Sequence, residues 1–177
     1  HGAGLEGYIR HKPMFDGLNF AGLKTFMAPQ LTWDSVRRIK DNSRMKVMLK
    51  GIVTREDALR CVELGVDGII VSNHGGRSDG GGRATMACLP EVIAAVDGRF
   101  PVIVDSGFRR GSDILKALAL GARAVCVGRP YLWGLGAFGH PGVEAVLDIL
   151  REELELAMRM SGIPWIKDVG PNLVHIA

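Results

Sequence analysis

The sequence predicts an α/β fold built on a parallel sheet, and three observations support this class. Short apolar runs rich in β-branched residues alternate along the chain with longer segments of helical pattern. Each apolar run ends in a polar or glycine-rich stretch. Glycine makes up 24 of the 177 residues, against about 7% in average proteins, which indicates many tight turns. Strands that alternate with helices form parallel sheets through right-handed crossovers, and the loops at their carboxyl ends carry the chemistry.

The first elements are expected after residues 1–30, which show no clear period and are predicted to form a flexible loop or lid segment. Thr32 is placed to cap a first helix, which precedes a short buried strand over 46–50. Thr54 caps a second helix with acidic residues in its first turn, and Gly65 ends it.

The next strand is expected over 68–72, a continuous run typical of a strand covered on both faces. A polar, glycine-rich loop over 73–83 and a helix over about 86–96 follow it. The remaining expected elements are a strand over 101–105, a helix over about 112–120 ended by Gly121, a strand over 124–127 and a long helix over about 141–161. The residues after 162 are expected to form an irregular tail over 163–177. The main domain is therefore predicted to cover 31–162.

The apolar stretch that follows the last expected strand contains Trp133, Leu135 and Phe138. We interpret it as core beneath that strand rather than as a cofactor-binding segment. His140 precedes Pro141 at a helix start, where a surface position is expected.

Composition and charge exclude several classes of function. A net charge of +3, spread along the chain, does not favour nucleic-acid binding. No apolar stretch approaches the roughly 18 residues that span a membrane. Cys61, Cys88 and Cys126 are far apart and lie in apolar runs, so neither a disulfide framework nor a metal site is indicated. We expect reduced core thiols in a cytoplasmic protein.

Glycine and arginine follow each of the last two expected strands. Gly107 and Arg109 come after the strand over 101–105, and Gly128 and Arg129 end the last strand. Glycine lets an anion approach the backbone, and guanidinium groups bind phosphate oxygens. Ordinary turns with solvated arginines are the alternative, but the repeated pair favours a phosphate site. It also favours half of a (β/α)8 barrel, which needs about 250 residues in full, over a small doubly wound domain.

A second group of polar residues follows the strand over 68–72. His74 lies just past this strand, and Arg77 is three residues further on, so the two side chains can reach the same space. A neutral imidazole can accept a proton, and a guanidinium can hold a carboxylate, which indicates a small acidic substrate. A loop histidine without a role is the alternative. Lys50, the last residue of its strand, could stabilise an anion, form a Schiff base or simply reach water.

Taken together, these motifs resemble those of the FMN-dependent α-hydroxy acid oxidases and dehydrogenases, which include glycolate oxidase, lactate oxidase, lactate monooxygenase and mandelate dehydrogenase. The resemblance covers about residues 31–162. It rests on the blocks over 49–52, 71–77, 104–111, 116–122 and 127–130. It implies a (β/α)8 TIM barrel that binds FMN, of which this chain would be the C-terminal half, strands five to eight with their helices.

The resemblance also implies roles for single residues. Lys50 would face the flavin and stabilise its negative charge, with Ser72 as a further flavin contact. His74 would take a proton from an L-2-hydroxy acid, whose carboxylate Arg77 would hold while the acid is oxidised to the 2-oxo acid. The residues implied to bind the FMN phosphate and ribityl chain are Asp105, Ser106, Gly107, Arg109, Gly128 and Arg129.

The chain departs from the family pattern in three ways. Many members have glycine where this chain has Ser106, which adds bulk beside the phosphate, and the loop over 78–83 differs from the common form. The family's first four strands are not present, so the strands over 46–50 and 124–127 would have unpaired edges. We therefore predict that the N-terminal half comes from a separate or cleaved polypeptide, and that the protein forms a homo-oligomer, a tetramer or larger.

Two alternatives stay open at this point. The chain could belong to another FMN barrel oxidoreductase or isomerase, of the isopentenyl isomerase or inosinate dehydrogenase kind, although these lack the catalytic pair of His74 and Arg77. It could also be a non-catalytic half barrel that binds a flavin or a phosphate.

Overall fold

The computed structural model describes residues 31–77 and 81–175. The chain divides into two units between Ser35 and Val36, and the second unit, Val36–Ala177, contains the sheet. The segment 1–30, for which the sequence predicts a flexible loop, lies outside the described residues, as does part of the loop over 73–83.

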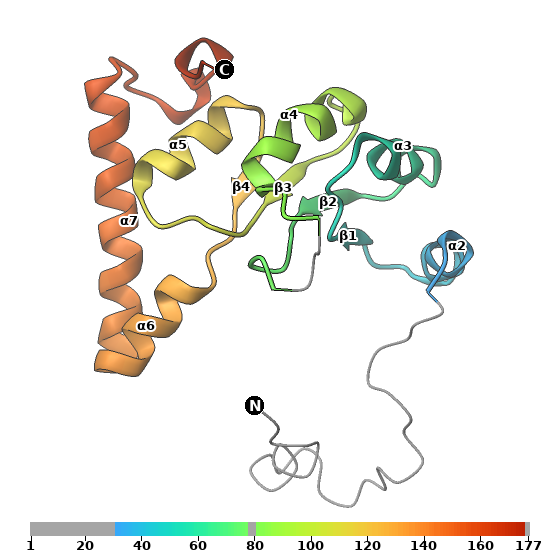
Figure 1. Cartoon of the computed structure of the whole chain (residues 1–177), viewed down its shortest axis with the longest axis horizontal. Helices are drawn as coiled ribbons and strands as arrows, with labels where there is room; N and C mark the ends of the chain where they lie inside the picture. The colour runs from blue at the N-terminus through green and yellow to red at the C-terminus, as the bar shows by residue number, and fades with distance from the viewer. Residues whose placement is uncertain (1–30, 78–80, 176–177) are drawn as a thin grey trace, which may run out of the picture. The chain divides into compact units, whose positions relative to one another are not determined.

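The centre of the second unit is a four-stranded parallel sheet whose strand order follows the chain, β1-β2-β3-β4 (Figure 1). The strands are β1 (Met48–Lys50), β2 (Gly68–Val71), β3 (Val102–Val104) and β4 (Ala124–Val125). Consecutive parallel neighbours require a crossover after every strand. The α/β fold with parallel strands is thus confirmed.

Helices form these crossovers and lie along one side of the sheet (Figure 1). The helices between strands are α3 (Arg55–Glu63), α4 (Thr85–Val96) and α5 (Gly111–Ala119). The helices that do not connect two strands are α2 (Trp33–Asn42), α6 (Arg129–Phe138) and α7 (His140–Met160). The tail contains two short 3-10 helices, Ile166–Asp168 and Pro171–Leu173. α7 packs against both α5 and α6. None of the helices in these described ranges combines the length and apolar character needed to span a bilayer.

The predicted ends of α3 are confirmed at both sides. The Thr54 side chain accepts a hydrogen bond from the amide of Asp57 at 3.2 Å, which satisfies one of the unpaired donors at the helix start. Gly65 follows the helix with φ +62°, a conformation that glycine adopts without strain.

Side-chain alternation along the strands places the core on the helix side of the sheet. Ile69, Val71 and Val104 are fully buried there. Ile70 and Ile103 are register partners that point to the opposite face and remain half-exposed. Within the described part of the chain, the strand over 68–72 is covered by helices on one face, and its second face stays partly exposed at Ile70.

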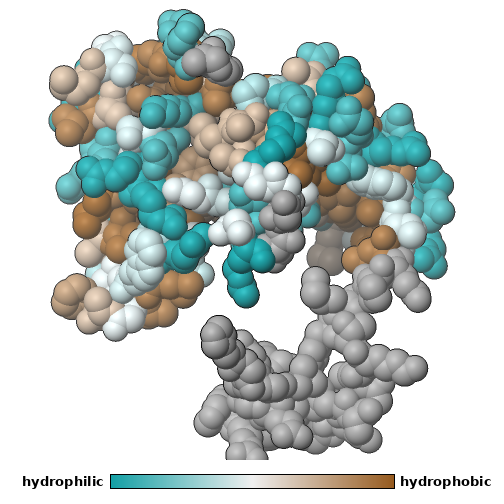
Figure 2. All heavy atoms as spheres, in the orientation of Figure 1, coloured by the Kyte–Doolittle hydropathy of each residue, from teal (hydrophilic) through white to brown (hydrophobic). Residues whose placement is uncertain are grey.

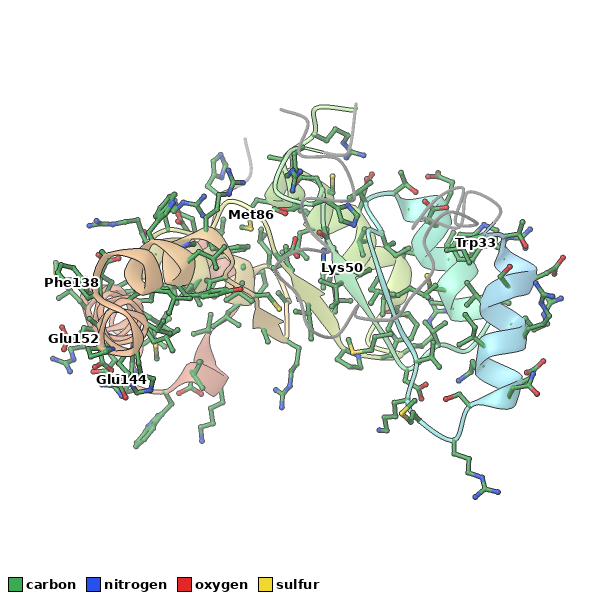
Figure 3. All side chains as sticks on the ribbon, turned by 90° about the horizontal axis from the view of Figure 1, so that it is seen from below. Trp33, Lys50, Met86, Phe138, Glu144 and Glu152 are labelled. Atoms are coloured by element: carbon green, nitrogen blue, oxygen red, sulfur yellow. The ribbon has the colours of Figure 1, made fainter. Side chains whose placement is uncertain are left out.

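The interpretation of the apolar stretch after β4 as core is also wrong. The stretch forms α6, and Trp133, Leu135 and Phe138 are 58%, 49% and 77% exposed. The helix packs instead through Gly134, whose backbone lies directly against that of Gly142 in α7. The apolar side chains consequently face away. Figure 2 shows hydrophobic surface around α6 and α7, and Figure 3 shows Phe138 on the outer side of these helices.

The three cysteines differ in their burial. Cys61 and Cys88 are buried, as expected of core thiols, whereas Cys126 is exposed just after β4. β4 is an outer strand with β3 as its single neighbour in the described sheet, so the residue that follows it is not covered.

Candidate functional site

A cavity of about 580 Å³ opens at the carboxyl ends of the four strands. Because the strands are parallel, the loops that follow them meet at this one edge of the sheet. The predicted site residues that line the cavity are Lys50, His74, Arg77, Asp105, Ser106, Gly107, Arg109, Gly128 and Arg129. The tenth, Ser72, is buried and hydrogen-bonded to residues of this set. The structure therefore brings all the predicted site residues together.

An ion pair connects the ends of β1 and β3. The ammonium group of Lys50 lies 3.1 Å from Asp105 Oδ2 and donates a hydrogen bond of 2.8 Å to Ser72 Oγ. Lys50, the last residue of β1, can be found by its label in Figure 3. Burial acts to raise the pKa of Asp105, but hydrogen bonds from Ser72, Ser106 and Lys50 and the charge of Lys50 together lower that pKa below its ordinary value. Asp105 therefore stays ionised and neutralises part of the lysine charge.

The loop after β2 carries His74 and Arg77, and both side chains are exposed to the cavity. His74 has φ +56°, and its amide donates to Ser72 Oγ at 3.1 Å. The imidazole ring lies over Gly51, where a Cβ atom would come within 3.2 Å of the ring carbon Cε1. Gly51 thus leaves room for the ring at the cavity wall.

The loop after β3 reaches back to the loop after β2. The Ser106 hydroxyl accepts a hydrogen bond from the amide of Gly75 at 3.0 Å and donates one to Asp105 Oδ1 at 2.7 Å. Arg129, the first residue of α6, donates to the carbonyl of Gly75 at 2.7 Å. Gly75 is therefore held from both sides.

The amides at the start of α5 are occupied by carboxylates of the chain itself. Asp113 Oδ2 accepts hydrogen bonds from the amides of Arg109 and Arg110, both at 3.0 Å. The amide of Gly111 donates to Glu153 Oε2 of α7 at 2.8 Å. Carboxylates of the chain thus take up the amides of Arg109, Arg110 and Gly111, and sequence reasoning missed both carboxylates. Asp113 could have been found from its position in the first turn of the helix.

The start of α6 is arranged differently. The N-cap residue of α6 is Gly128, which has no side chain to accept hydrogen bonds from the first amides of the helix. A helix start of this kind attracts anions, and the guanidinium groups of Arg109 and Arg129 line the same cavity. The Arg109 guanidinium also lies 5.0 Å from the centre of the Trp133 ring. The positive end of the cavity is therefore built by α6 and two arginines.

The residues present fit a mononucleotide-sized anionic ligand. The cavity volume lies within the range of roughly 300–1,000 Å³ of cofactor sites. A Cβ atom at Gly107 or Gly128 would meet no atom within 4 Å, so a ligand can approach the backbone there. Among residues 31–77 and 81–175, no three His, Cys, Asp or Glu side chains gather as a metal site would require. The donors of this cavity are cations and amides, which suit a phosphate.

Comparison with known proteins gives a consistent result. The family model described as FMN-dependent dehydrogenase matches residues 7–176. The chain is 50% identical over 145 residues to peroxisomal (S)-2-hydroxyacid oxidase GLO4 of Arabidopsis thaliana, covering 82% of this chain and 40% of the relative. It is 44% identical over 168 residues to L-lactate oxidase of Nostoc sp., covering 95% of this chain and 46% of the relative.

Solved structures show the same likeness. A mandelate oxidase variant with a monooxide FMN adduct matches with a TM-score of 0.77 and 46% identity, covering 83% of this chain and 46% of that one. A flavocytochrome b2 variant with pyruvate bound matches with a TM-score of 0.80 and 38% identity, covering 84% and 39%. The chain thus spans less than half the length of these proteins.

Proposed function

Because the chain belongs to the FMN-dependent dehydrogenase family, we propose that it takes part in the oxidation of an L-2-hydroxy acid to the 2-oxo acid. The observation that carries this proposal is the cavity in which His74 and Arg77 meet the arginines after β3 and β4. Such an oxidation needs a base and a cationic group that pairs with the substrate carboxylate, and both lie in the cavity whose other end suits a phosphate.

The chain is proposed to be the C-terminal half of a (β/α)8 barrel. Its share of the solved relatives, 46% and 39% of their chains, supports half of such a barrel. The outer strands β1 and β4 each have one neighbour in the described sheet. The remaining strands would come from polypeptide outside the present sequence. A homo-oligomer and a cytoplasmic location stay predictions, and the name of one relative carries the word peroxisomal.

FMN is the cofactor of the family, and when bound it accepts the two electrons removed from the substrate. Arg109, Arg129 and the backbone at Gly107 and Gly128 would hold its phosphate and ribityl chain. Lys50 would lie beside the ring, where its ammonium group favours negative charge. The neighbouring Asp105 and Ser72 fix the position of this ammonium group.

His74 and Arg77 would act on the substrate itself. The guanidinium of Arg77 pairs with the substrate carboxylate through two hydrogen bonds, which orients the molecule in the cavity. A ring nitrogen of His74 accepts the proton of the 2-hydroxyl group. Gly51 leaves space for the imidazole ring. The hydrogen bond from the His74 amide to the Ser72 hydroxyl fixes the backbone that carries this ring.

The test is anaerobic addition of lactate, glycolate or mandelate to the complete FMN-loaded protein. We expect bleaching of the flavin absorbance with at least one of these acids. The His74→Gln variant should bind FMN equally well and bleach about 10²–10⁴ times more slowly. A yellow protein that none of the three acids bleaches would contradict the proposal and favour a non-catalytic flavin-binding role.

A further inference from the structure

The peptide bond after His74 is held by a side chain from the neighbouring strand's loop. The amide of Gly75 donates to Ser106 Oγ at 3.0 Å, across a separation of 31 residues in the sequence. The same hydroxyl donates to Asp105 Oδ1 at 2.7 Å. A serine hydroxyl can donate one hydrogen bond and accept others, so both interactions form at once. Ser106 thus joins the loop after β3 to the loop after β2.

The backbone at Ser106 is unusual for a residue with a side chain. Its φ angle is +73°, in a region that L-residues rarely adopt. The buried hydroxyl of Thr85 holds this backbone. It donates to the carbonyl oxygen of Asp105 at 2.7 Å, and the carbonyl oxygen of Ser106 lies 3.3 Å from the same hydroxyl. Strained residues of this kind persist where the surroundings fix them, often at functional sites. Glycine would adopt the same φ with less strain, so the serine contributes through its hydroxyl.

The bridge bears directly on His74. Among the described residues, no side chain or backbone group hydrogen-bonds the imidazole ring, so the backbone bonds of His74 and Gly75 are the polar contacts that hold this residue within the described part of the site. His74 itself has φ +56°, with its amide on Ser72 Oγ and the next amide on Ser106 Oγ. Arg129 holds the following carbonyl, that of Gly75.

We propose that Ser106 is a positioning residue, which fixes the backbone of His74 relative to the turn that binds the phosphate. The inference rests on the proposed function, because it takes His74 as the base. It adds a connection within the site: the Ser106 hydroxyl joins the loop that holds the cofactor to the loop that carries the base, beside the bond from Arg129 to the Gly75 carbonyl.

Two substitutions in the complete FMN-loaded protein test this role. Ser106→Ala removes the hydroxyl and keeps the strain, whereas Ser106→Gly removes both. We expect each to lower kcat at saturating FMN about fivefold, the worth of one net hydrogen bond of about 1 kcal/mol. The KM for the hydroxy acid and the Kd for FMN should change less than twofold. Ser112→Ala, which removes an exposed hydroxyl of α5, is the matched control and should leave kcat unchanged.

Two readouts do not depend on turnover. The melting temperature of Ser106→Gly should stay close to that of the wild type, because relief of the backbone strain offsets the lost hydrogen bonds. Hydrogen exchange at the Gly75 amide should be faster in both Ser106 variants than in the wild type and in Ser112→Ala, since its acceptor is gone.

Several results would overturn the proposal. These are an unchanged kcat in both Ser106 variants, a loss confined to FMN affinity, or a fall in the melting temperature of Ser106→Gly that accounts for the lost activity. Unchanged exchange at the Gly75 amide would do the same. If the wild type binds no FMN or oxidises no hydroxy acid, the proposed function fails, and the exchange measurement still decides whether Ser106 forms the bridge.

Discussion

Lys50, Ser72 and Asp105 form the polar centre of the site, and they come from three different strand ends. The ion pair between Lys50 and Asp105 spans 3.1 Å, and the aspartate side chain is 17% exposed. Such a partly buried pair is less screened by solvent than a surface pair. The pair therefore keeps the ammonium group of Lys50 in place at the cavity wall even when no ligand is bound.

The lowered pKa of Asp105 predicts a dependence of stability on acid. A carboxyl group whose pKa is lower in the folded than in the unfolded state stabilises the fold above the unfolded value, near 3.8, and this contribution is lost as the pH falls through the folded value. The free energy of unfolding should therefore fall more steeply below about pH 4 in the wild type than in Asp105→Asn. Urea unfolding between pH 3 and 6 measures this. Asp148→Asn, at an exposed site of α7, should follow the wild type, and equal slopes for all three proteins would contradict the assignment.

The thiols give a second prediction for single residues. Burial, with the nearby charge of Asp57, raises the pKa of Cys61 to about 11, whereas Cys126 is exposed and lines the cavity. Thiolates are the reactive form, so iodoacetamide at pH 8 should modify Cys126 well before Cys61. FMN should slow the labelling of Cys126 because it occupies the same cavity. Peptide mass spectrometry reads the order, and labelling of Cys126 at the same rate with and without FMN would contradict the placement of the cofactor.

Sequence reasoning found the site residues because it located strand ends, and parallel strands bring their ends together. It could not find what holds these residues in place. Ser106 was expected among the residues that bind FMN, with its side chain as added bulk beside the phosphate, yet its hydroxyl reaches Gly75, 31 positions away. Glu153 caps Gly111 across 42 positions. Such contacts depend on the packing of distant elements, which no local pattern contains.

At the scale of elements, the strands and the helices between them agree with the prediction to within a few residues, because capping residues and glycines mark their ends. Helix α6 was missed. Its sequence begins at Arg129, contains two glycines and exposes large apolar side chains, so it does not show the pattern of an amphipathic helix. The contact of Gly134 with Gly142 decides its position.

The two glycines of α6 form a matched pair for a test. A Cβ atom at Gly134 would collide with the carbonyl oxygen of Gly142, whereas one at Gly136 would meet nothing within 4 Å. Gly134→Ala should lower the free energy of unfolding by about 1–3 kcal/mol through overpacking. It should also weaken FMN binding, since α6 begins at Arg129. Gly136→Ala should raise stability by up to about 1 kcal/mol, because alanine favours a helix. Urea unfolding and FMN titration measure both effects, and equal behaviour of the two variants would contradict the packing of α6 on α7.

At the scale of the whole molecule, the sheet is open at both sides. β1 and β4 each pair with one strand in the described sheet, and Ile70 and Ile103 on one face of the sheet are partly exposed. Unpaired edges and uncovered apolar surface favour association. The exposed side chains of α6, Trp133 and Phe138 among them, add to this surface. These features suit a chain that completes its barrel with further strands.

An open sheet of this kind predicts the behaviour of the chain on its own. Expressed alone, it should associate or aggregate and bind FMN weakly. Co-expressed with the first half of a family barrel, it should form a complex that retains FMN. Size-exclusion chromatography with light scattering gives the masses. A folded monomer of this chain alone that binds FMN tightly would contradict the proposed half barrel.

The proposed chemistry requires that one cavity hold both the phosphate of FMN and the base that acts on the substrate. A crystal structure of the complete protein with FMN and a 2-oxo acid would show whether it does. We expect the phosphate within hydrogen-bond distance of Arg109 and Arg129, the ring beside Lys50, and the 2-oxo acid between His74 and Arg77. A phosphate bound away from the loops after β3 and β4, or a 2-oxo acid out of reach of His74, would contradict this arrangement.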